Sequence, residues 1–284
     1  MSTTTEQRLD TRAAAVLGDR IEAAAYADLY RGTPPALRAR LGLAVETVAG
    51  ATALVATALP VPMFNRVIGL GLGLDTPARA ADVETLQRLY RGAGIANWWL
   101  HWNPFAAPAD FVAQLSALGF TAPARQRWVK LLRSTAATPS TSETSLTIAP
   151  STDSEVDATA RAIVAAFEMP PFAADWVASV HGRARWRLYT ARAGEAIAGG
   201  AALFVDGHAC WLGIGGVLAA YRQRGGQTAL IARRLADAGT AGVRWAVTET
   251  GEPVRDEANP SLANLRRSGF EAVASRLNFA APAS

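Results

Sequence analysis

Residues 215–230 read Gly-Gly-Val-Leu-Ala-Ala-Tyr-Arg-Gln-Arg-Gly-Gly-Gln-Thr-Ala-Leu. An apolar, β-prone run over 208–217 leads into a short basic loop with paired glycines, and a helical pattern follows from Thr228. The first backbone N–H groups of a helix have no partner within the helix, so a Gly-Gly loop at that point lets an anion approach bare backbone. Arg222 and Arg224 add positive charge. The stretch therefore predicts a phosphate-binding loop between a strand and a helix.

The spacing of the glycines excludes two common nucleotide-binding loops. The stretch contains neither the GxxxxGKS or GxxxxGKT loop of mononucleotide-binding proteins nor the GxGxxG turn of dinucleotide-binding folds. It resembles the GNAT family of acyl-CoA-dependent N-acyltransferases, whose motif is Gln or Arg, two residues, Gly, one residue, then Gly or Ala. Residues 222–226 fit this motif, and Gln227 departs from it, as it does in a subset of the family.

The sequence after the loop strengthens the resemblance. A helix is expected to 238 and a strand over 243–248, followed by Asn259-Pro260-Ser261, a short helix and Gly269-Phe270, which is the family's order. The resemblance is strong over about residues 146–280 and faint before them. It implies an α/β (α+β) fold of two GNAT-like domains, each a mixed, mostly antiparallel twisted sheet flanked by helices.

The resemblance also implies acetyl-CoA as co-substrate and assigns residues to it. The predicted cofactor-binding residues are Gly215, Gly216, Val217, Arg222, Gln223, Arg224, Gly225, Gly226, Gln227, Thr228 and Asn259. Asn259 precedes a proline, and an Asn-Pro pair is also typical of the start of a helix. Asn259 therefore has two predicted roles, as a cofactor contact and as the N-cap of a helix.

A carboxylate at the end of a strand is the candidate general base. Alkylammonium groups have a pKa near 10, so an amine must lose a proton before it attacks a thioester. Glu249 follows the expected strand 243–248 and is the first choice for base or ammonium anchor; a solvated loop carboxylate is the alternative, and Glu252 is a weaker candidate. Many family members carry a tyrosine on the last helix as general acid, but Leu262 and Leu265 stand at the plausible positions. The acid is therefore unassigned.

The pattern of elements suggests two copies of one unit. Residues 115–120 (Leu-Ser-Ala-Leu-Gly-Phe) resemble residues 265–270 (Leu-Arg-Arg-Ser-Gly-Phe), and each segment follows strand, helix and strand patterns. The small, polar segment 134–145 reads as a linker. We expect a tail over 1–11, a degenerate GNAT-like domain over 12–133 with Asp75 at the helix start where a pyrophosphate would rest, the linker, and an acetyl-CoA-binding domain over 146–284.

Composition limits the partners. The chain has 284 residues, half of them hydrophobic and 18% charged, with a net charge of +4 and one lysine, Lys130, among spread arginines. This distribution lacks the clustered basic patch of a nucleic-acid-binding protein. Cys210 is the only cysteine and reads as a buried thiol, and three scattered histidines lack the spacing of metal ligands, so no metal is expected.

The chain carries no pattern typical of membrane attachment. Its first residues lack the apolar core of a signal peptide, and the uncharged run 47–65 is interrupted by prolines. We expect a cytoplasmic monomer or homodimer. Trp98, Trp99 and Trp102 lie on an expected strand over 95–102, so one side could line a cleft and bind an apolar part of the substrate.

The sequence thus favours an N-acetyltransferase that moves an acetyl group from acetyl-CoA to a primary amine of a small molecule. Two alternatives stay open at this point. One is acetylation of peptides or proteins, and the other is a non-catalytic acyl-CoA sensor, which Gln227 and the missing tyrosine keep in view.

Overall fold

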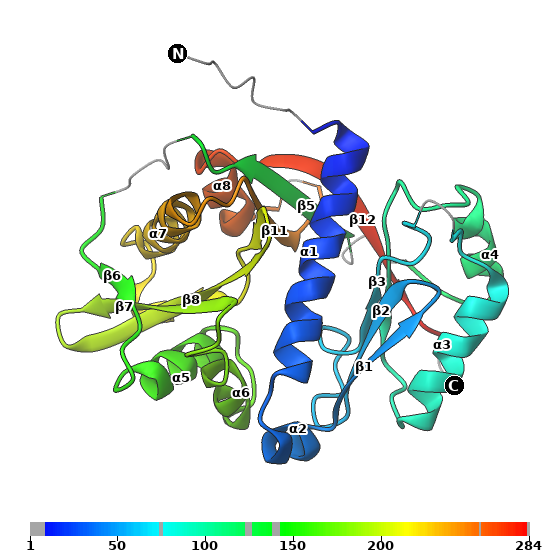
Figure 1. Cartoon of the computed structure of the whole chain (residues 1–284), viewed down its shortest axis with the longest axis horizontal. Coiled ribbons are helices and arrows are strands. Elements are labelled where there is room, and N and C mark those ends of the chain that lie inside the picture. The colour runs from blue at the N-terminus through cyan, green and yellow to red at the C-terminus, as the bar shows by residue number, and fades with distance from the viewer. Residues whose placement is uncertain (1–8, 74–75, 123–126, 138–142, 256, 283–284) are drawn as a thin grey trace.

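The computed structural model describes residues 9–73, 76–122, 127–137, 143–255 and 257–282, and Figure 1 shows their arrangement. The strands are β1 (Leu43–Val48), β2 (Ala51–Ala56), β3 (Arg66–Ile68), β4 (Trp99–Trp102), β5 (Arg127–Ser134), β6 (Thr147–Pro150), β7 (Trp186–Ala193), β8 (Ala196–Asp206), β9 (Ala209–Trp211), β10 (Gly215–Val217), β11 (Trp245–Gly251) and β12 (Glu271–Ala280). The helices are α1 (Thr11–Arg31), α2 (Pro35–Leu41), α3 (Ala80–Gly92), α4 (Phe111–Ala117), α5 (Val156–Ala166), α6 (Ala174–Ala178), α7 (Gly226–Thr240) and α8 (Pro260–Arg267), with 3-10 turns η2 (Pro171–Ala173) and η3 (Ala219–Tyr221).

All the strands belong to one mixed sheet. Its order is β1-β2-β3-β4-β12-β5-β11-β9-β8-β7-β6, with β10 paired to β8 outside this path. The pairs β3·β4 and β9·β11 are parallel and the others are antiparallel. The mostly antiparallel α/β class expected from the sequence is therefore confirmed. The sheet runs through both halves of the chain, because β5 of the first half lies between β11 and β12 of the second.

Two expected elements of the first half differ in the structure. The helix expected from 75 begins at Ala80, where the Arg79 N–H donates to Asp82 Oδ2 at 2.9 Å; residues 74 and 75, and with them the expected start at Asp75, lie outside the described residues. The strand expected over 95–102 is only Trp99–Trp102, because its parallel neighbour β3 is three residues long and supplies pairing from Trp99 onward.

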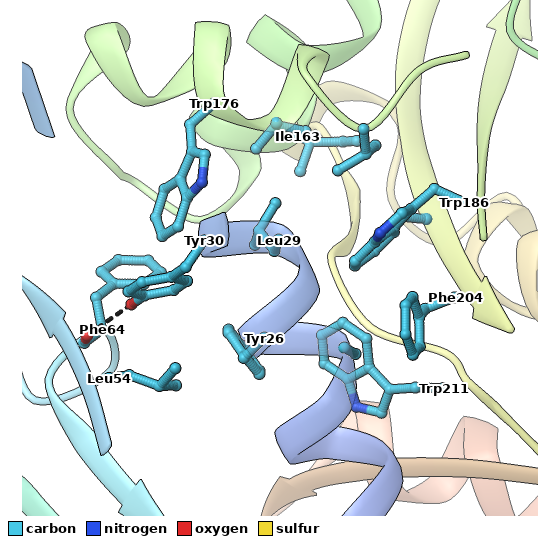
Figure 2. Close-up of a cluster of buried hydrophobic side chains, with 14 of the residues drawn as sticks. Tyr26, Leu29, Tyr30, Leu54, Phe64, Ile163, Trp176, Trp186, Phe204 and Trp211 are labelled. Carbon is cyan, nitrogen blue, oxygen red and sulfur yellow. Dashed lines mark hydrogen bonds between the residues drawn. The ribbon is translucent and has the colours of Figure 1, made fainter. Parts of the chain in front are cut away.

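Helix α1 packs against both halves of the chain. It crosses the middle of the molecule in front of β5 and β12 (Figure 1). Figure 2 shows Tyr26 and Tyr30 of α1 between side chains of the two halves: Tyr30 lies beside Phe64 and donates its hydroxyl to the Phe64 carbonyl at 2.6 Å, and Tyr26 lies 5.1 Å from the Trp211 ring. One hydrophobic core therefore joins α1, the start of the sheet and the α5–α6 side.

A buried network of charged side chains fixes α1 to the sheet. The acids are Asp19 and Glu22 of α1 and Glu249 of β11, and the bases are Arg66 of β3, Lys130 of β5 and Arg276 of β12. Each of these side chains is at most 1% exposed, except Glu249 at 6%. The three acids balance the three bases, so the network carries no net charge.

Glu22 is the centre of this network. It accepts from Arg66 at 2.9 Å, from Arg276 at 2.6 Å and from the Lys130 ammonium. Burial raises the pKa of Glu22, but the positive charges of Arg276, Lys130 and Arg66 outweigh burial and hold the pKa well below its usual value. Glu22 is therefore a carboxylate in the folded protein.

Replacing Glu22 by Gln should destabilise the protein strongly. The substitution leaves three buried cations with two acids, and removing one partner of a buried ion pair typically costs about 3–5 kcal/mol. Urea unfolding measures the loss. Glu84→Gln, at an exposed position of α3, is the matched control and should change stability by less than about 0.5 kcal/mol. Equal effects of the two substitutions would show that the network does not hold α1.

His101 lies next to the network and is buried without a hydrogen-bond partner among the described residues. It stands opposite Asn278 in the β4·β12 pair. Burial lowers the pKa of His101 well below its usual value, and the positive charges of Arg276 and Arg66 lower it further. The imidazole is therefore neutral in the folded protein.

His101 should make the protein less stable as the pH falls from 7.5 to 5.5. In this range the unfolded chain gains a proton on this residue near its ordinary pKa of about 6.5, while the folded protein does not. We expect the free energy of unfolding to fall less steeply with decreasing pH in His101→Gln than in the parent chain. The difference in slope should correspond to at most about one proton bound on unfolding. Urea unfolding across this range tests it, with His208→Gln at an exposed position as control. An unchanged slope in His101→Gln would contradict the prediction.

Candidate active site

Two neighbouring strands separate in the middle of the sheet. β9 pairs with β11 as far as Trp211 and Val247, and the last contacts are the Leu212 N–H to the Val247 carbonyl at 2.8 Å and the Thr248 hydroxyl to the Leu212 carbonyl at 2.9 Å. Beyond them β10 pairs only with β8, whereas β11 stays with β5 to Gly251. The run expected as one strand over 208–217 is thus broken. Ile214, with a φ of 49°, lies at the break and redirects the chain.

The separation turns backbone groups of β10 toward the gap. The Ile214 carbonyl accepts from Ala202 at 3.2 Å and the Leu218 N–H donates to Ala198 at 2.9 Å. Because backbone groups alternate along a strand, those of Gly215 and Val217 point away from β8. The Val217 carbonyl accepts from Arg222 Nε at 3.4 Å.

Gly216 is required by close packing behind the gap. A Cβ on Gly216 would lie 2.8 Å from the Ala166 Cβ at the end of α5. A larger residue would push β10 away from α5 and into the gap.

The loop after β10 leads into the N-terminus of α7. Gly225 is the residue before the helix and has a φ of 71°, in the left-handed region that glycine adopts without strain. The first hydrogen bond of the helix runs from the Ala229 N–H to the Gly225 carbonyl at 3.0 Å. The N–H groups of Gly226, Gln227 and Thr228 precede it and point along the helix axis, as an anion-binding helix start requires.

One cavity of about 1210 Å³ connects the helix start to the gap. Nine of the predicted cofactor residues line it: Gly215, Gly216, Val217, Arg222, Gln223, Gly225, Gly226, Gln227 and Thr228. Arg224 and Asn259 do not. The Arg224 guanidinium lies over the Tyr221 ring at 5.4 Å, and its side chain is exposed beside the loop.

Asn259 is the N-cap of α8. Its Oδ1 accepts from the Leu262 N–H at 2.9 Å, and its Nδ2 donates to the Gly251 carbonyl at 2.6 Å. The residue thus joins the end of β11 to α8, which confirms the prediction that it caps this helix. Its contact with a cofactor stays a prediction. Leu262 and Leu265 are both buried, and Leu265 lines the cavity.

Glu249 lines the same cavity, where β11 meets the gap. Its Oε2 accepts from Lys130 at 2.9 Å and from Trp211 Nε1 at 3.0 Å, and its Oε1 accepts from Trp211 Nε1 at 3.1 Å. These contacts fix the carboxylate and tie it to the buried charge network. Because each carboxylate oxygen can accept about two hydrogen bonds, Oε1 keeps acceptor capacity.

The aromatic wall of the cavity differs from the one expected. Trp98 stacks on Tyr90 at 4.3 Å and Trp102 on Phe111 at 5.2 Å, so both belong to the core of the first half, and Trp99 does not line the cavity. The tryptophans that do are Trp128 of β5 and Trp211 of β9.

Two other kinds of functional group among the described residues are candidate metal ligands and the thiol. They contain no group of three His, Cys, Asp or Glu side chains able to hold a metal ion. Cys210 is fully buried, and burial raises the pKa of its thiol to about 12. Within the same residues, no helix has both the length and the apolar character needed to cross a bilayer.

Sequence comparison alone does not place the chain: no protein-family profile and no curated protein matches it. Solved structures identify its fold. A GCN5-related N-acetyltransferase from Kribbella flavida superposes with a TM-score of 0.64 at 18% identity, covering 94% of this chain and 96% of that one. The fold is that of the GNAT N-acetyltransferases.

Two further solved structures support this assignment across the whole chain. A GCN5-related N-acetyltransferase from Sphaerobacter thermophilus has a TM-score of 0.59 at 17% identity, covering 96% of this chain and 93% of its own. A tandem GNAT protein from the clavulanic acid biosynthesis pathway has a TM-score of 0.60 at 17% identity, with 97% of each chain covered. These superpositions cover both halves of the chain, and the description of the first half as a degenerate GNAT-like domain stays a prediction.

Proposed function

We propose that the protein is an N-acetyltransferase that moves an acetyl group from acetyl-CoA to the primary amine of a small molecule. One observation carries the proposal: a single cavity connects an anion-binding helix start to a fixed carboxylate through a gap between two strands. The GNAT fold supports acyl transfer, and the acetyl donor and amine acceptor are the finer part of the proposal.

The residues along the cavity fit the parts of coenzyme A in order. The N–H groups at the start of α7 and the Arg222 guanidinium hold the diphosphate, with the helix dipole adding about 0.3–1 kcal/mol. The backbone groups of Gly215 and Val217 pair with the amides of the pantetheine arm as an added strand would. The thioester then lies where β9 and β11 separate, next to Glu249.

Glu249 supplies the base. It takes a proton from the substrate ammonium, directly or through a water molecule, and the free amine attacks the acetyl carbonyl carbon. A backbone N–H facing the gap donates to the developing oxyanion. The C–S bond then breaks, the electron pair leaves with the coenzyme A thiolate, and the second proton of the nitrogen passes to that thiolate as the amide forms.

Adding a negative charge at Gly225 should weaken cofactor binding strongly. Gly225→Asp places a carboxylate at the helix start and repels the diphosphate, so we expect the Kd for coenzyme A, measured by calorimetry, to rise at least 30-fold. Gly182→Asp is a matched control, because Gly182 has a φ of 75°, is exposed and has open space at its Cβ position. If both variants bind like the parent chain, the diphosphate site lies elsewhere.

Replacing Glu249 by Gln should remove the base and keep the cofactor site. We expect kcat/KM for amine acetylation, followed by thiol release, to fall roughly 100-fold or more while the Kd for acetyl-CoA changes little. Glu252→Gln is the matched control, since Glu252 follows the same strand, bonds the Ser275 hydroxyl at 2.5 Å and does not line the cavity. Unchanged turnover in Glu249→Gln would show that the base assignment is wrong. If the protein binds acetyl-CoA but releases no coenzyme A thiol with any amine tested, it is a sensor and not an enzyme.

A further inference from the structure

The end of the cavity that holds Glu249 lies on the sheet face covered by α1. Trp128 and Lys130 lie two residues apart on β5 and so share a face, as do Gly251 and Glu249, their partners on β11. Trp211 stands beside Val247, two residues from Glu249. The start of α7 packs with the opposite core, which includes Ile231 and Leu265. The cofactor and acceptor ends of the cavity are therefore on opposite faces.

Large apolar side chains from five segments line the cavity. They are Tyr26 of α1, Met63 of the β2–β3 loop, Trp128 of β5, Phe167 after α5 and Trp211 of β9. The Tyr26 ring lies 5.1 Å from the Trp211 ring, and the Arg66 guanidinium lies 4.2 Å from the Tyr26 ring and 5.4 Å from the Trp128 ring. These contacts hold three of the rings around Glu249.

Phe167 is held in place at the end of α5, yet its side chain is half exposed to solvent. It follows α5, where the Phe167 N–H donates to Ile163 at 3.2 Å, and Glu168 with a φ of 55° ends the helix. Its side chain lines the cavity and is 51% exposed. A large apolar side chain held at a cavity mouth gains contact when an apolar ligand covers it.

The charges of the wall limit the substrate further. Among the described residues that line the cavity, Glu249 is the single acid, so a second ammonium group would have no partner. The arginines belong to the cofactor end: Arg222 lies in the loop, Arg267 on α8, and Arg234 donates to the Leu230 and Ala202 carbonyls at 3.0 Å each. Lys130 bonds Glu249 but is buried and does not line the cavity, so a substrate carboxylate would meet no lining cation beside Glu249. Burial raises the pKa of Tyr26, so its hydroxyl adds no charge.

We propose that the acceptor is a monoamine whose amino group is carried on an aromatic or similarly bulky apolar group without a second charge, such as an arylalkylamine. This rests on the proposed acetyl transfer. The ammonium binds Glu249, with the faces of Tyr26, Trp128 and Trp211 nearby to favour a cation, and the apolar body packs against Met63 and Phe167.

A panel of four amines with acetyl-CoA tests the proposal. We expect kcat/KM for 2-phenylethylamine to exceed that for ethylamine by about 100-fold. Putrescine tests a second ammonium group and phenylalanine tests a carboxylate on the same ring, and neither should exceed ethylamine. A preference for putrescine or phenylalanine would overturn the inference and leave acetyl transfer standing.

Phe167→Ala adds a test of the wall itself. It should lower the preference for 2-phenylethylamine over ethylamine about tenfold and leave the Kd for acetyl-CoA unchanged. Phe172→Ala is the matched control, because Phe172 is 42% exposed on η2 and does not line the cavity. Equal preferences in the two variants would exclude Phe167 from the site and contradict the proposal.

If no amine is acetylated, the proposed function fails, and the subsite is judged by binding alone. Titration of the coenzyme A-loaded protein, followed by tryptophan fluorescence, should then show saturable quenching by 2-phenylethylamine that Phe167→Ala weakens about tenfold. Equal responses to 2-phenylethylamine and putrescine would overturn the subsite as well.

Discussion

The buried ion network between α1 and the middle of the sheet is the constraint on which the rest of the structure depends. Glu22 meets Arg66, Lys130 and Arg276, which come from three different strands. Buried ion pairs seldom add much net stability, because desolvation cancels most of their attraction. They do penalise every arrangement in which a charge loses its partner, so the network sets where α1 lies along the sheet. The aromatic residues of α1 then fall between the two halves of the core (Figure 2).

The network also links the candidate chemistry to the first half of the chain. Lys130 bonds Glu22 on one side and Glu249 on the other, so the carboxylate at the gap is held by a strand that the first half supplies. Tyr26 and Trp128, from the same half, stand in the cavity wall. The second half contributes the loop and helix start that fit a diphosphate. The first half therefore lines the candidate cavity, while its description as a degenerate GNAT-like domain and the boundaries at 134–145 stay predictions.

Part of the fold and of the candidate site could be predicted from the sequence, because it depends on local conformational preferences. The glycine pair at the start of α7 and the Asn259-Pro260 cap of α8 each follow from what one or two residues permit, and the structure has both. The acceptor wall was not readable, because Trp128 reaches it only through the position of β5 between β11 and β12. Signals existed: the sole lysine stands between Val129 and Leu131, and Asp19, Glu22 and Tyr26 recur at helical spacing on α1. Which strands they would meet depended on pairing between distant segments.

The place of β12 has a consequence for how the chain is made. It is the last strand in the sequence, yet it lies between β4 and β5, pairing Leu277 with Trp102 and Arg276 with Trp128. Until β12 has been synthesised, β4 and β5 each lack this neighbour and present an open edge, and Arg276 is missing from the ion network. Closure of the sheet between β4 and β5 thus waits until β12 is available. Before that point, a nascent chain of this topology exposes unpaired strands to aggregation or to a chaperone.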